Sequence, residues 1–182
     1  MLFLSSDQIR SRTPELQSLF SALIKFQPAQ VFWRIHQTQI FTGLGPDNVG
    51  TNLREARHHS RVNKVFINYF EVWNSLDGGK RYMLDRAYFH LDISRPDGTG
   101  DEELLALHCD PNIDPSDPSY SYKRGPHMHL AFKRFDFHKS HISLCIQNVD
   151  KTCSDFRIFS KTFADVIEMI NIEFMERLKA NL

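Results

Sequence analysis

The sequence lacks a long hydrophobic run, and this absence shapes the first expectations about the protein. No apolar stretch approaches the roughly 20 residues that a membrane-spanning helix needs, and the opening residues MLFLSSD have neither the basic start nor the apolar centre of a secretory signal. Cysteine is also scarce: the three residues, without a Cys-x-x-Cys spacing, indicate reduced thiols rather than a disulfide framework. We therefore expect a soluble, cytoplasmic protein that does not bind membranes.

An excess of charge of one sign is absent as well. Lysine and arginine number 22, and aspartate and glutamate also number 22, so the chain lacks the overall basic character of most proteins that bind nucleic-acid backbones. A local basic patch is still compatible with these numbers. The 182 residues are 41% hydrophobic and include 15 phenylalanines, which is enough apolar material for one core and favours a sheet-rich fold.

Hydrophobic periodicity predicts an α+β fold. Thr13 as N-cap and Pro14 as first helical residue predict the start of a helix, and Pro28 ends the apolar stripe that follows them. Seven of the eleven residues 64–74 are apolar or aromatic, and they fall on both faces of a strand, which is typical of a buried central strand. The other strand-like runs are residues 30–41, 81–94, 102–110, 127–134 and 140–147.

These runs predict an antiparallel meander of five or six strands. Residues 76–80, LDGGK, have the composition of a hairpin turn, whereas the glycine-rich residues 43–50 indicate a loop. A closing helix is expected over residues 162–179, with Thr162 and Asp165 as a capping box and its apolar stripe packed on one face of the sheet. We expect one domain over residues 1–182, made of an N-terminal helix and basic segment (1–63), the sheet (64–148) and the C-terminal helix (160–180).

The stretch RGPHMHLAF at residues 124–132 is the most informative for function. Side chains two residues apart in a strand share a face, so His127 and His129 should point the same way, and Met128 and Leu130 the other way. A hairpin centred near residue 137 would place His129 opposite Cys145. The polar face is then expected to carry Arg86, His90, Asp92, His108, Asp110, His127, His129 and His141.

Two kinds of chemistry fit this set of residues. Without a metal, one histidine would accept a proton from a ribose hydroxyl, another would donate a proton to the leaving oxygen, and a cation would stabilise the charge on phosphorus. The candidates for that mechanism are His127, His129, His141, His90 and Arg86, with Lys123 as an alternative cation. With a metal, His127 and His129 would be joined by His108 or Asp110 around zinc, manganese or iron. Spacing alone does not choose between the two.

Basic residues occur in two places that could contact phosphate groups. Arg54, Arg57 and Arg61 lie in a basic segment, and Lys123 and Arg124 come just before the paired histidines. A solvated turn or short helix is the plainer interpretation of the basic segment. If the histidine face is an active site, we expect these five cations to bind the phosphates of an RNA or nucleotide substrate.

The order of these features resembles the TumE family of toxins from bacterial toxin–antitoxin loci. The resemblance covers residues 64–178 and rests on a hairpin, a strand that ends in LLALHCD, a loop, the stretch GPHMH and a closing helix. It implies a bacterial toxin or defence component that blocks growth, with RNA as the target. The positions that it carries over are Asp110, His127 and His129, and it implies an antitoxin as protein partner.

A second resemblance and a non-catalytic alternative stay open. The stretch HISL at residues 141–144 is similar to the His-h-Ser-h tetrad of the 2H phosphoesterases, in which two histidines act as acid and base on a phosphodiester. The corresponding stretches at His90 and His129 lack the serine or threonine. Alternatively, the protein binds a partner without catalysis, and residues 114–124, rich in Pro, Ser and Tyr, become ordered on that partner.

Overall fold

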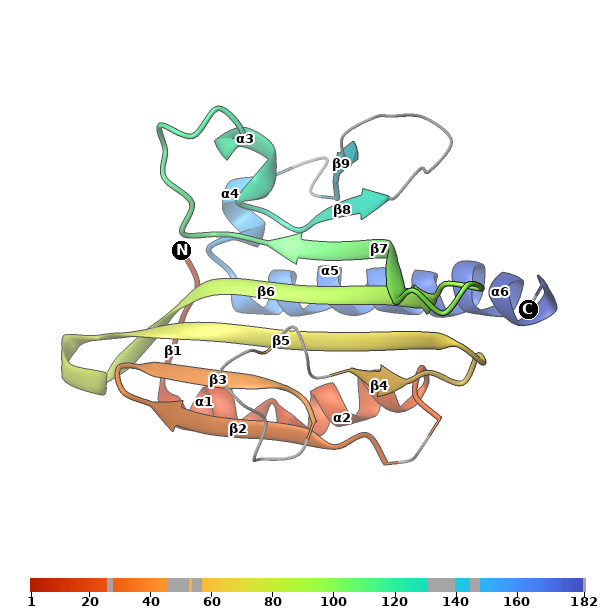
Figure 1. Cartoon of the computed structure of the whole chain (residues 1–182). Helices are drawn as coiled ribbons and strands as arrows, with labels where there is room; N and C mark the ends of the chain where they lie inside the picture. Colours follow the sequence, from red (N-terminus) through yellow and green to blue (C-terminus); the bar gives the residue numbers. More distant parts are fainter. Residues whose placement is uncertain (26–27, 46–52, 54–56, 131–139, 145–147, 182) are drawn as a thin grey trace.

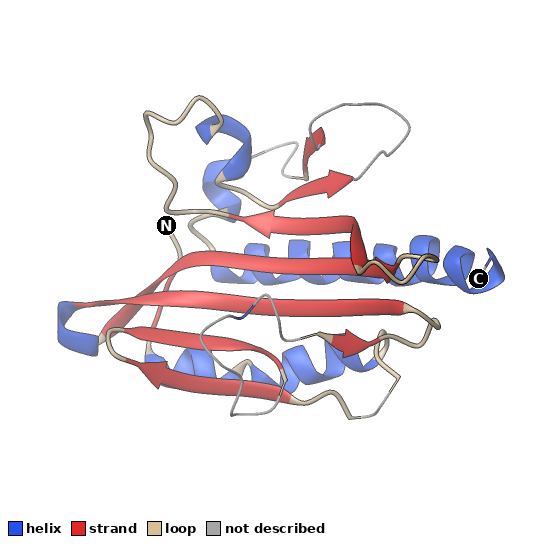
Figure 2. Ribbon diagram, in the orientation of Figure 1, coloured by secondary structure: helices blue, strands red, loops and turns tan. Residues whose placement is uncertain are grey.

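The computed structural model describes residues 1–25, 28–45, 53, 57–130, 140–144 and 148–181, and for Tyr122, Ser140 and His141 it describes the backbone alone. A single antiparallel sheet runs through this part of the chain, with helices on one of its faces (Figures 1 and 2). The predicted α+β class is confirmed. No helix within the described residues is both long enough and apolar enough to cross a membrane.

Among the described residues, the sheet has nine strands in the order β2-β3-β5-β6-β7-β8-β9, with β1 paired to β6 and β4 to β5. The strands are β1 (Phe3–Leu4), β2 (Val31–His36), β3 (Gln39–Leu44), β4 (His58–His59), β5 (Val65–Leu76), β6 (Arg81–Ser94), β7 (Asp101–Cys109), β8 (His127–Leu130) and β9 (Ser140–Ser143). The count exceeds the predicted five or six for two reasons. The single strand expected over residues 30–41 is a hairpin that turns at Gln37, where φ is 53°. Two further strands have only two residues each.

The helical elements are α1 (Ser6–Ser11), α2 (Thr13–Ser21), the 3-10 turn η2 (Asp77–Gly79), α3 (Tyr120–Lys123), α4 (Val149–Thr152), α5 (Phe156–Met169), the π-helical η3 (Ile170–Met175) and α6 (Glu176–Asn181). A helix begins at Thr13 and Pro14 as predicted, but its N-cap is Arg12 and Thr13 is its first residue. The closing helix was expected from Thr162 and is longer: its N-cap is Asp155, whose side chain accepts a hydrogen bond from the Arg157 N–H. Aspartate at that position satisfies an N–H that would otherwise have no partner, so the helix begins there.

Paired residues on neighbouring strands form rows of side chains that cross the sheet, and successive rows point to opposite faces. One row runs Tyr69, Phe89, Leu107 and Met128 across β5, β6, β7 and β8. These residues belong to the main core, where α1, α2 and α5 cover them with side chains such as Phe20 and Phe163. The next row, one residue along each strand, therefore faces away from these helices.

That opposite face is only partly open. On β2, β3 and β5 it forms a second, smaller core, in which Leu53 packs among Phe32, Phe41, Phe70 and Val72. Gly43, expected in a loop, is part of β3 and pairs with Phe70. The turn predicted at residues 76–80 is confirmed, with φ of 66° at Gly78 and 89° at Gly79. Beyond the second core, on β6, β7 and β8, the same face carries the predicted histidines.

The register of the last hairpin differs from the prediction. His129 pairs with His141, four residues away from the expected Cys145, and His127 pairs with Ser143. A shift by four residues, an even number, leaves each residue facing the same side of the sheet, so the predicted polar face is retained. The expected turn centre near residue 137, like Cys145, lies outside the described residues.

Candidate metal centre

Three neighbouring strands bring four histidines onto one face of the sheet. In one row, Tyr88 of β6 pairs with His108 of β7, which pairs with His127 of β8. In the next row on that face, His90 pairs with Ala106, and Ala106 pairs with His129. The small side chain of Ala106 leaves space between the larger residues on either side. The antiparallel register therefore assembles a cluster that is spread over 40 residues of sequence.

His108, His127 and His129 form a group that could hold a metal ion. One ring nitrogen from each lies within 4.8 Å of the others. The ring centroids of His108 and His129 are 4.3 Å apart, and those of His127 and His129 are 5.0 Å apart. Nitrogens bound to one tetrahedral zinc ion lie about 3.3 Å apart, so small side-chain rotations would complete a site.

His127 is held in the orientation that a metal ligand requires. Its ring is fully buried, and Nδ1 donates a hydrogen bond to the carbonyl oxygen of Gly125 at 2.9 Å. A carbonyl can only accept, so the proton is on Nδ1, and the lone pair of the neutral ring is on Nε2. Metal-bound histidines commonly have this kind of second contact, which fixes both the tautomer and the ring plane.

His108 is kept neutral by its surroundings. Its ring stacks on Tyr88 with 4.0 Å between centroids, and its Nε2 is buried without a hydrogen-bond partner among the described residues. Burial, followed by repulsion from His129, His90 and His127, lowers the pKa of His108 to about 2. A neutral imidazole is the form that binds metal ions, so His108 need not lose a proton to act as a ligand.

The fourth histidine is bonded to a carboxylate. His90 is 4% exposed, its Nδ1 lies 3.0 Å from Glu103 Oε2, and its ring centroid is 5.0 Å from that of His108. Sequence reasoning missed Glu103, because strict alternation along β7 places it on the core side. A bulge between Leu91 and Asp92 shifts the register so that Glu103 pairs with Asp92 and reaches the histidine face.

Asp110, one of the predicted metal ligands, lies outside the three-histidine group. Its Oδ1 accepts a hydrogen bond of 2.5 Å from the Tyr88 hydroxyl. Burial raises the pKa of Asp110, whereas this hydrogen bond, Lys123 and Arg86 act in the opposite direction. Burial and the Asp110 contact raise the pKa of Tyr88. Asp110 therefore fixes the aromatic ring against which His108 stacks.

The predicted phosphate-binding cations do not form one patch within the described residues. Arg57 pairs with Asp101 at the start of β7, and Arg61 donates to the Ser21 carbonyl at 3.0 Å. Lys123 and Arg124 lie at the other end of β7, where the Lys123 carbonyl accepts from the Asp110 N–H at 3.2 Å. Arg124 pairs with Asp150 and with the Tyr120 hydroxyl. Arg54 lies outside the described residues.

The remaining candidates are Arg86 and His141. Arg86 is 46% exposed and lies 3.6 Å from Asp85, with its strand position two residues from Tyr88. The backbone of His141 pairs with that of His129, and its side chain is outside the described part of the chain. The structure thus groups four of the predicted histidines and leaves the cations at the edges.

No family model, curated protein sequence or solved structure matches this chain.

Proposed function

We propose that the protein is a metal-dependent hydrolase whose divalent ion, zinc or manganese, is held by His108, His127 and His129. The observation that carries the proposal is the convergence of three imidazole nitrogens within 4.8 Å on one face of the sheet. Three histidine ligands leave a coordination position for water, as catalytic zinc sites do. A metal ion bound there would lower the pKa of that water and supply a nucleophile.

His90 is the residue placed to exchange protons with that water. Its hydrogen bond to Glu103 orients the ring, and its ring lies next to that of His108 but is not one of the three whose nitrogens converge. A carboxylate paired to a histidine favours the protonated ring and makes it a stronger base. We assign His90 the role of general base, with Glu103 as the residue that positions it.

A phosphodiester of RNA or of a nucleotide is the proposed substrate. Its support is the positive charge of Lys123 and Arg86, which both act on the Asp110 carboxyl at the edge of the cluster. An anionic substrate lying across that edge would meet cations on one side and the metal ligands on the other. Cleavage of RNA in this way would suit the toxin-like role, with an antitoxin as partner, that the sequence resemblance implies.

The test compares wild type with His127→Ala/His129→Ala, and with the matched control His36→Ala/His59→Ala, which removes two exposed histidines outside the cluster. Elemental analysis of the purified proteins should find one zinc or manganese per chain in wild type and control, and none in the cluster variant. Hydrolysis of an RNA oligonucleotide should fall at least about 100-fold in the cluster variant, and in wild type after chelation.

Different failures have different meanings. Hydrolysis that survives chelation would rule out the metal and favour histidines acting as acid and base, with His141→Ala as the next variant. Stoichiometric metal without hydrolysis would rule out the hydrolase and leave a structural ion. Circular dichroism on each variant separates these results from unfolding.

A second candidate function is non-catalytic binding of a partner. It is favoured by exposed apolar side chains on the C-terminal helical run formed by α5, η3 and α6. Ile172 and Met169 are 56% and 37% exposed, and Phe174 and Leu178 line a cavity of about 420 Å³ on the same run. If partner binding is the function, expression of Ile172→Lys in bacteria should abolish any growth effect of the wild type, whereas His127→Ala/His129→Ala should retain it. The opposite pattern would favour the hydrolase.

A further inference from the structure

Two cysteines that are distant in sequence meet at the end of β7. Cys109 is the last residue of β7, and Cys153 is the C-cap of α4. Both Sγ atoms contact the same acceptor, the carbonyl oxygen of Arg124, at 3.5 Å from Cys109 and 3.2 Å from Cys153. A hydrogen bond also joins the two thiols. The fold therefore holds two sulfur atoms next to each other.

Both cysteines are free thiols, and both are buried. Neighbouring residues of a strand point to opposite faces of the sheet, so Cys109 faces the main core, whereas His108 faces the histidine cluster. Cys109 thus meets Cys153 on the side of the sheet away from the three-histidine group. The contact between the thiols is independent of any metal ion bound by that group.

A cavity of about 310 Å³ gives small molecules access to one of the two sulfurs. Residues 111–115, which follow β7, line it together with Arg124, Asp150 and Cys153. Of the two cysteines, Cys153 belongs to the lining and Cys109 lies behind it. Hydrogen peroxide is only slightly larger than water, so a cavity of this size admits it.

The surroundings of Cys153 favour its reaction with an oxidant. The hydrogen bond with Cys109 lowers the pKa of Cys153, burial raises it, and the positive charge of Arg124 lowers it further, with a net decrease. A lower pKa increases the fraction of thiolate at neutral pH, and the thiolate is the nucleophilic form of cysteine. Cys153 is therefore the cysteine expected to react first.

We propose that Cys109 and Cys153 are a reversible redox pair, which hydrogen peroxide converts into an intramolecular disulfide. The Cys153 sulfur attacks one peroxide oxygen: an S–O bond forms, the O–O bond breaks, and the departing hydroxide leaves as water with the thiol proton. The Cys109 sulfur then attacks Sγ of the Cys153 sulfenic acid. The S–S bond forms, the S–O bond breaks, and a second water leaves with the Cys109 proton. Each sulfur loses one electron, and each peroxide oxygen gains one.

The disulfide closes a covalent loop over residues 109–153, which includes β8 and β9 and therefore His127 and His129. A crosslink stabilises a folded protein mainly by restricting the unfolded chain, and the effect increases with the length of the loop. Oxidation should therefore raise the melting temperature by at least about 5 °C. Reduction by dithiothreitol should reverse this shift.

The test treats the purified protein with hydrogen peroxide, blocks the remaining thiols and digests the protein with trypsin without reduction. The three cysteines fall in different tryptic peptides, residues 87–123, 140–151 and 152–157, so the digest identifies which two are linked. In monomeric protein, peptide 87–123 should be linked to peptide 152–157, and dithiothreitol should separate them. Absence of this link, or oxidation of Cys153 to sulfinic acid without a link, would overturn the proposal.

Three variants assign the roles. Cys145→Ser is the matched control: it removes the third cysteine and should keep both the link and the rise in melting temperature. Cys153→Ser should lose both. Cys109→Ser should accumulate the Cys153 sulfenic acid, which dimedone traps.

A rise of the same size in a folded Cys153→Ser protein would overturn the assignment, as would a predominant link from peptide 140–151 in wild type. Circular dichroism establishes that each variant is folded. The digest of wild type decides the pairing even where a variant does not fold.

Discussion

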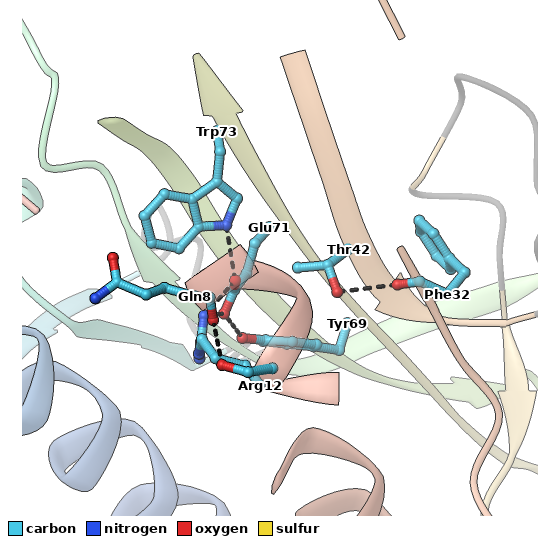
Figure 3. A network of polar contacts seen from close by, with 8 residues as sticks. Gln8, Arg12, Phe32, Thr42, Tyr69, Glu71 and Trp73 are labelled. Carbon is cyan, nitrogen blue, oxygen red and sulfur yellow. Dashed lines mark hydrogen bonds and ion pairs between the residues drawn. The ribbon is translucent and has the colours of Figure 1, made fainter. Parts of the chain in front are cut away.

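Replacing Glu71 by glutamine should destabilise the protein strongly, because the change leaves the Arg12 charge buried without its counter-ion. Arg12 is 5% exposed and Glu71 is fully buried, so water cannot replace the lost contact. Breaking a buried ion pair from one side costs about 3–5 kcal/mol. The Tyr69 hydroxyl and Trp73 Nε1 donate to different oxygens of Glu71 (Figure 3), and the glutamine amide keeps only one acceptor oxygen, so at least one of these two contacts changes as well.

The double variant Arg12→Met/Glu71→Gln removes both charges. Comparing it with each single variant gives the cost of leaving one buried charge without its partner. Arg12→Met alone leaves Glu71 ionised with only its two neutral donors, and should also cost about 3 kcal/mol or more. The double variant should lose less than Glu71→Gln alone, about 1–3 kcal/mol, so the coupling between the sites is at least about 3 kcal/mol.

Urea unfolding, followed by circular dichroism, gives the free energy of unfolding of wild type, the two single variants and the double variant. The exposed pair Arg177–Glu173, with side chains 79% and 53% exposed, is the control, and removing it should cost only about 0.5 kcal/mol. Additive effects of the two buried changes, or a loss below about 1 kcal/mol in Glu71→Gln, would refute this account of the pair.

Three further changes test other parts of the structure. Gly43→Ala should cost about 3 kcal/mol in urea unfolding, because its Cβ would lie 2.3 Å from the Tyr69 carbonyl oxygen, and an equally stable variant would contradict the close approach of β3 to β5. Asp155→Ala should cost about 1 kcal/mol and lower the helical circular dichroism signal, because the Arg157 N–H loses its cap, and an unchanged signal would argue against that cap. Folding lowers the pKa of His108 from its ordinary 6.5 to about 2. Between pH 6.5 and about 2 the unfolded chain therefore binds a proton on His108 that the folded protein does not, and the free energy of unfolding falls as the pH falls through this range. With a chelator present, wild type should lose about 2 kcal/mol more than His108→Asn between pH 7 and pH 5, and parallel curves would contradict the depressed pKa.

Much of the candidate site could be predicted from local pattern. Alternation along a strand assigns His127 and His129 to one face and Met128 to the other, and the structure agrees. The predicted pairing of His129 with Cys145 was wrong, because strand alternation does not define the length of the turn between two strands. The register differs by four residues, an even number, so each side chain stays on the predicted face. Glu103 could not be predicted, because the bulge that moves it to the histidine face depends on how β6 and β7 pair.

The sequence by itself determined which side chains could share a face, where α2 begins to within one residue and where the turn before β6 lies, since periodicity, a proline in the first helical turn and positive φ act over a few residues. The tertiary structure alone decided that His108 meets His127 and His129, and that Arg12 meets Glu71, 59 residues away. These contacts depend on strand register and helix packing. Both are set by burial of the whole apolar core, and no local segment encodes that burial.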